Sequence, residues 1–155
     1  MKKLLTAGCF LPLIAVFALT GCGTSPYTVF KNATGVAVPE CGAVSTIDTT
    51  GWFGDGELVY TFHLDEENGT VFETRVQTAA HWHSLPMSAT LEELVYEHFH
   101  RVIPRVESGY YFFYDEQNKR YSVPDNYFEQ SYSYDFVIGL YDTETLTVYY
   151  YEQHT

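Results

Sequence analysis

The chain has 155 residues and a formal net charge of −12, with 20 acidic side chains against 8 basic ones. So acidic a protein repels nucleic acid and anionic lipid headgroups, and neither is expected as a partner of its surface. The length allows one ordinary domain, and only 3 cysteines argue against a disulfide framework or a cysteine metal cluster.

Residues 1–21 have the features of a secretory signal peptide. Lys2 and Lys3 form a basic start, and residues 4–20 are uncharged and largely apolar. Because the lysines hold the N-terminus inside, the rest of the chain is expected outside the cytoplasm. An uncleaved N-terminal anchor is the alternative, and it gives the same location.

The end of this leader, Leu19-Thr20-Gly21-Cys22, resembles the lipobox of bacterial lipoproteins. The resemblance implies cleavage before Cys22 and a thioether link from its sulfur to diacylglycerol. The acylated protein would then be anchored in the cell membrane and face outward, with two acyl chains giving stable attachment. Cys41 would be the one cysteine left unmodified, and it is interpreted as a bystander.

Residues 22–46 are rich in Gly, Ser, Thr, Ala and Pro, a composition typical of a flexible tether. Such a tether would hold the body of the protein roughly 25–30 Å from the membrane. The sequence therefore predicts a folded domain over residues 47–155.

Alternating apolar residues predict a strand over residues 57–65. Residues 66–80 are ambiguous: Asn68-Gly69 could turn a hairpin, whereas Phe72 and Val76 fall at helical spacing. We favour the helix.

A capping-box pattern from Thr90 to Glu93 predicts a second helix, which Pro104 ends. Strands are predicted over residues 110–115, 134–142 and 146–153, and the last two form an antiparallel, Tyr-rich hairpin. In this hairpin one face is expected to bring together Phe136, Ile138, Leu140, Leu146, Val148 and Tyr150. The pattern indicates a single small α+β domain with an antiparallel sheet and one or two helices.

Four segments of this body are similar to a family of mainly Gram-positive bacterial proteins of unknown activity. The segments are DTTGWFGDGE, WHSLP, IPRVESGYYFFYDE and YSYDFVIGLYDTETLTVYYYEQ. The resemblance covers roughly residues 48–155. It supports the domain boundary and implies no chemistry.

Two histidine pairs could supply metal ligands, His81 with His83 and His98 with His100. On the predicted helix, residues two apart point away from each other, so His98 and His100 are not expected to share an ion. His81 and His83 would point to the same side if extended, about 7 Å apart. The alternative for them is a packed or exposed loop without metal.

The acidic residues Asp48, Asp55 and Glu57 could act as the acid and base of an envelope hydrolase. The glycines around Asp55 favour a turn that leads into a strand. Trp52, Asp55 and Trp82 are also candidate binding residues. Aromatic side chains such as the two tryptophans are common at interfaces.

The favoured function is that of a lipid-anchored binding or interaction module with a protein or glycan partner in the cell envelope. No cofactor is expected, and the absence of nucleophile-elbow, zinc-protease and phosphate-loop motifs makes an enzyme the less favoured hypothesis. The hydrolase and a metal-binding surface protein using His81 and His83 remain as alternatives.

Overall fold

The computed structural model describes residues 24–40, 43–51, 55–98, 103–130 and 133–155. Its elements, in chain order, are α1 (Pro26–Thr34), β1 (Ala43–Asp48), β2 (Gly56–His63), α2 (Glu66–Thr78), β3 (Trp82–Ser84), α3 (Ala89–Glu93), the π-helix η1 (Leu94–His98), β4 (Gly109–Asp115), α4 (Tyr127–Gln130), β5 (Phe136–Asp142) and β6 (Thr147–His154). Cys22, Cys41, Trp52, His100 and the side chain of His98 lie outside the described part.

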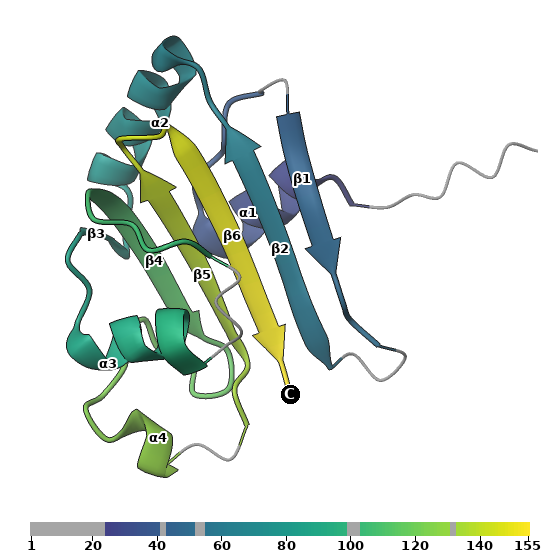
Figure 1. Ribbon diagram of the computed structural model, residues 1–155, viewed down its shortest axis with the longest axis vertical. Coiled ribbons are helices and arrows are strands. Elements are labelled where there is room, and N and C mark those ends of the chain that lie inside the picture. Colours follow the sequence, from purple (N-terminus) through teal and green to yellow (C-terminus); the bar gives the residue numbers. More distant parts are fainter. Residues whose placement is uncertain (1–23, 41–42, 52–54, 99–102, 131–132) are drawn as a thin grey trace, which may run out of the picture.

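The strands form one antiparallel sheet in the order β1-β2-β6-β5-β4-β3 (Figure 1). The predicted α+β domain with an antiparallel sheet is confirmed, as are the strands near residues 57–65, 110–115, 134–142 and 146–153. The last two pair as the predicted hairpin.

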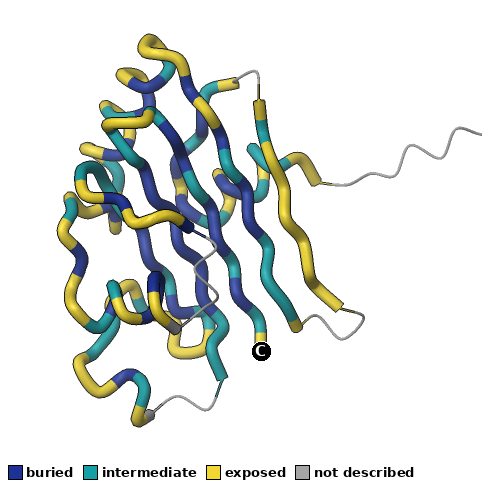
Figure 2. Tube along the Cα trace, in the orientation of Figure 1, coloured by how far each residue is buried: buried dark blue, intermediate teal, exposed yellow. Residues whose placement is uncertain are grey.

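Helices cover both faces of this sheet (Figure 1). One core lies under α1 and α2 and contains Phe30 and Phe72, and the other lies under α3 and η1 and contains Leu91 and Leu94. The central strands are therefore dark along most of their length in Figure 2, whereas β1 at the edge is mostly exposed. Within the described residues, no helix is both long and apolar enough to cross a bilayer.

The predicted facing of the β5–β6 hairpin is wrong by one residue. Ile138 pairs with Tyr151 and Leu140 with Tyr149, so Val148 and Tyr150 lie on the opposite face. The shift arises because Leu146 belongs to the turn, with φ 52°, and not to the strand. A slip of one residue moves every side chain of a strand to the other face.

The predicted flexible tether over residues 22–46 is also wrong for the part described. Pro26 begins helix α1, and Gly35 ends it in the left-handed conformation, with its N–H donated to the Lys31 carbonyl at 2.9 Å. Phe30 is completely buried, and its ring lies 5.7 Å from that of Phe62 and 5.9 Å from that of Tyr150. The domain therefore begins about 20 residues earlier than the composition indicated.

Helix α2 confirms the favoured alternative for residues 66–80, because Asn68-Gly69 lies in its first turns and not in a hairpin. Asp65 caps it by accepting the Asn68 N–H at 2.8 Å. The next helix starts two residues earlier than predicted, since Ser88, and not Thr90, is its cap. Its predicted end at Pro104 follows residues 99–102, which lie outside the described part.

Candidate functional site

A groove of about 340 Å³ opens where α1 and α2 end beside β3 and β4. Its volume is at the lower end of the roughly 300–1,000 Å³ that small-molecule sites occupy. The groove is lined by Asn32, Ala33, Thr34, Gly35, Ala79, Ala80, His81, Phe112 and Tyr121. None of these side chains is acidic, and none is a lysine or an arginine.

The small residues in this lining follow from the way the two helices end. Gly35 closes α1, and Ala79 closes α2 by donating its N–H to the Val76 carbonyl at 3.3 Å. Because both ends lack bulky side chains, they leave space above Phe112, which is almost fully buried beneath them.

Two aromatic rings form the exposed wall of the groove. The imidazole of His81 stacks on the ring of Tyr121, with centroids 3.6 Å apart and planes 6° from parallel. Tyr121 is 41% exposed, and its other ring neighbours are Phe112 at 5.8 Å and Tyr114 at 4.8 Å. The stack, which we call the 81/121 pair, is held by residues 40 positions apart in the sequence.

The backbone at His81 is in the left-handed region, with φ 66°. For an L-residue this conformation costs roughly 1–2 kcal/mol, and glycine is its usual occupant. Strained residues cluster at binding and catalytic sites, where the surrounding structure enforces them. Here the strain brings an exposed imidazole onto Tyr121.

The same conformation overturns the expectation that His81 and His83 point to one side. His83 lies in β3 opposite Tyr111, with ring centroids 5.5 Å apart, whereas His81 contacts Tyr121 beside Phe112. Tyr111 and Phe112 are consecutive in a strand and face opposite sides of the sheet. No group of three metal-ligating side chains occurs among the described residues.

Trp82, one of the predicted binding residues, is a core residue in the structure. It is only 7% exposed, and its Nε1–H is donated to the Thr34 carbonyl at 3.3 Å. It supports the groove from behind by fixing the end of α1 to the sheet. Trp52, the other predicted aromatic, lies outside the described residues.

The three acidic residues proposed for a hydrolase have separate surroundings. Asp48 accepts the side-chain and backbone hydrogen bonds of Thr50, which hold the pKa of its carboxyl below the usual value. Glu57 accepts the hydroxyl hydrogen of Tyr151 at 3.0 Å. Asp55 lines a different hollow that includes neither of them. The lowered pKa keeps Asp48 ionised at neutral pH, which does not suit a general acid. The turn expected around Asp55 includes residues 52–54, which lie outside the described part.

The hollow beside Asp55 is mostly acidic, and its histidine, His154, is engaged with neighbouring carboxylates. His154 lies 2.7 Å from Glu152 through Nε2, and its Nδ1 lies 3.8 Å from Glu116. Asp135 accepts the Thr155 N–H at 2.9 Å. These contacts fasten the end of β6 to the neighbouring turns.

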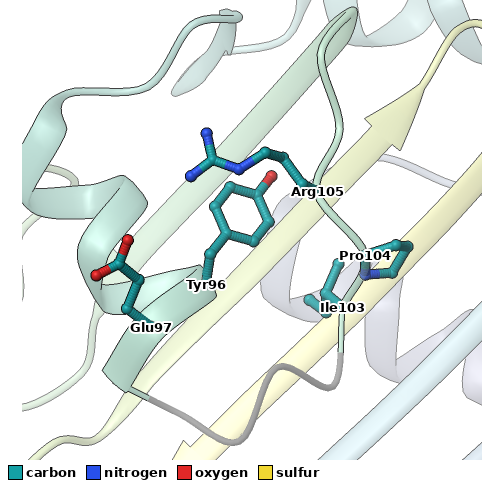
Figure 3. A pocket seen from close by; sticks show the side chains of 5 residues that line it. All are labelled: Tyr96, Glu97, Ile103, Pro104 and Arg105. Carbon is teal, nitrogen blue, oxygen red and sulfur yellow. The ribbon is translucent and has the colours of Figure 1, made fainter.

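A third hollow, of about 330 Å³, lies beside η1 and is shown in Figure 3. Arg105 lies over the ring of Tyr96, 5.0 Å from its centroid, and also pairs with Glu92 at 3.5 Å. The Tyr96 hydroxyl accepts the Val106 N–H at 3.3 Å, and burial raises the pKa of this tyrosine. Its polar groups stabilise the local packing, which leaves the groove at the 81/121 pair as the stronger candidate.

Among the predicted site residues that the structure describes, only His81 lines this groove. Tyr121 was missed, because nothing local distinguishes it from the other 13 tyrosines. Comparison with protein-family models, with curated proteins and with solved structures finds no match to the chain.

Proposed function

We propose that the protein is a lipid-anchored bacterial lipoprotein, facing outward from the cell membrane, whose domain binds a component of the cell envelope. The anchor rests on the lipobox-like Leu19-Thr20-Gly21-Cys22. The binding role rests on one observation, the uncharged groove whose wall is the 81/121 pair. Exposed aromatic rings beside small residues are typical of a recognition surface.

Metabolic labelling tests the anchor. The full chain, expressed in bacteria supplied with an alkyne fatty acid, is expected to take up label and to enter the detergent phase of a Triton X-114 separation. Cys22→Ser is expected to abolish both, whereas the matched change Cys41→Ser leaves both intact. Label that persists in Cys22→Ser contradicts the proposed attachment.

Cosedimentation with purified bacterial sacculi tests the binding role. The wild-type chain is expected to sediment with them, and Tyr121→Ala to weaken this by about tenfold, as loss of an aromatic anchor commonly does. Val71→Ala is the matched control, because Val71 is 38% exposed on α2 and does not line the groove. Equal sedimentation of wild type and Tyr121→Ala contradicts the assignment of the groove as the binding site.

A further inference from the structure

We infer that the groove at the 81/121 pair binds a neutral saccharide, with one sugar ring lying against the exposed aromatic wall. This inference rests on the proposed function and specifies its ligand.

The lining is uncharged in a protein that carries a net charge of −12. The two other hollows described above include charged side chains, Glu97 and Arg105 in one and Asp55 and Lys119 in the other. A further hollow beside α1 includes Lys31 and Glu40. An anionic polymer is repelled by the protein as a whole, and a cation finds no counter-charge in the groove. The lining therefore matches a neutral ligand.

The walls of the groove combine an apolar aromatic face with polar groups. In the 81/121 pair each ring covers one face of the other, and the surface left exposed, with Tyr121 41% exposed, can attract the polarised C–H bonds on one side of a sugar ring. The Asn32 amide, the His81 nitrogens and the Tyr121 hydroxyl can exchange hydrogen bonds with sugar hydroxyls. Ala33, Gly35, Ala79 and Ala80 are small enough to let a flat ring approach.

Because the backbone of His81 is strained, a change to glycine at this position can separate a role in binding from a role in the fold. Glycine adopts φ 66° without cost, so His81→Gly relieves the backbone while it removes the imidazole. A histidine that served only the fold, through its stack on Tyr121, would lower the melting temperature when replaced and leave the affinity unchanged. A histidine retained for binding is expected to show its effect in affinity, and not in the melting temperature.

The test is titration of the full chain, purified in a detergent without a sugar headgroup, with three probes followed by calorimetry. The neutral probes are tetra-N-acetylchitotetraose and cellotetraose, and the anionic probe is trigalacturonate. At least one neutral probe is expected to bind. Tyr121→Ala is expected to weaken that binding about tenfold and His81→Gly about fivefold, with melting temperatures near that of wild type, whereas Val71→Ala binds normally.

Each other result has a distinct meaning. Tighter binding of trigalacturonate than of either neutral probe, or neutral binding that survives Tyr121→Ala, overturns the inference. If neither neutral probe binds while sacculi still sediment the wild type, the saccharide assignment is wrong and the binding module stands. If sacculi also fail to sediment the chain, both the saccharide assignment and the proposed envelope-binding role are wrong.

Discussion

The buried carboxylate of Asp115 accepts the Nε–H of Arg120 at 3.0 Å, one residue before Tyr121. It also accepts the backbone and side-chain N–H groups of Asn118, both at 2.9 Å. Backbone bonds between Asp115 and Arg120 close the same turn. The turn returns the chain along β4, and Tyr121 thereby reaches Phe112 and His81.

Asp115→Asn is therefore expected to lower stability and to weaken ligand binding, although Asp115 does not line the groove. An amide cannot replace a carboxylate that accepts hydrogen bonds from three donors. We expect the free energy of unfolding to fall by about 2 kcal/mol, a figure kept low because Arg120 is partly exposed and its ion pair with Asp115 is screened by water. Urea unfolding measures the stability, and sacculus sedimentation measures the binding. The exposed Asp125→Asn is the control, and equal stability of the two variants contradicts the prediction.

Phe30→Ala is expected to destabilise the domain by about 3–5 kcal/mol, the usual cost of truncating a buried phenylalanine. The reason is that its ring is completely buried against the sheet. Thr28→Ala, at an exposed position of the same helix, is expected to stay within about 0.5 kcal/mol of wild type. A Phe30→Ala variant as stable as Thr28→Ala would mean that α1 is not part of the core.

Alkaline solution is expected to destabilise the fold. Burial, reinforced by Glu152 for Tyr150 and by Glu57 for Tyr151, raises the pKa of both hydroxyls above the usual range. The unfolded chain loses these protons near pH 10, but the folded chain retains them. The contribution of these two hydroxyls to the free energy of unfolding is therefore fully present below about pH 10. Above that pH the free energy of unfolding falls by up to about 1.4 kcal/mol per pH unit for each tyrosine.

Urea unfolding between about pH 8 and pH 11 measures this slope. In Tyr151→Phe one titrating group is absent, so the decline is expected to be shallower. A free energy of unfolding that stays constant above pH 10 is incompatible with the raised pKa values.

Gly109→Ala is expected to prevent normal pairing of β4 with β5. At φ 145° an added Cβ would lie 1.8 Å from the Tyr141 carbonyl oxygen, and the cost should exceed about 4 kcal/mol. Gly35→Ala is the matched control, since Gly35 is also at positive φ but an added Cβ meets nothing within 4 Å. That variant should lose only about 1 kcal/mol in urea unfolding. Similar losses in the two variants contradict the steric explanation.

Four of the six strands were predictable from the local pattern of apolar residues. Strand β1 was missed because its segment has the composition of a tether, and β3 because it is only 3 residues long. Helix α1 was missed because its Thr, Ala and Gly content resembles a linker, although the Ser25-Pro26 start and Gly35 stop are recognisable helix boundaries. The hairpin register was missed because it depends on the conformation of Leu146, which no local pattern indicates.

The groove was the least predictable feature of the protein. It needs the ends of two helices, a left-handed His81 and a turn closed by Asp115, and only the tertiary structure brings these together. The sequence did single out His81, but for metal chemistry. Its partner Tyr121 comes from a separate turn.

The position of α1 has a consequence for how the protein sits at the cell surface. Cys22 precedes Pro26 by 4 positions, a length that reaches about 14 Å when fully extended. With the proposed lipid on Cys22, the folded body would therefore lie close above the headgroups, with little freedom to tumble. Its groove would then reach only envelope components that come within about the height of one folded domain of the membrane surface, and a soluble partner would have to approach from the side away from the membrane.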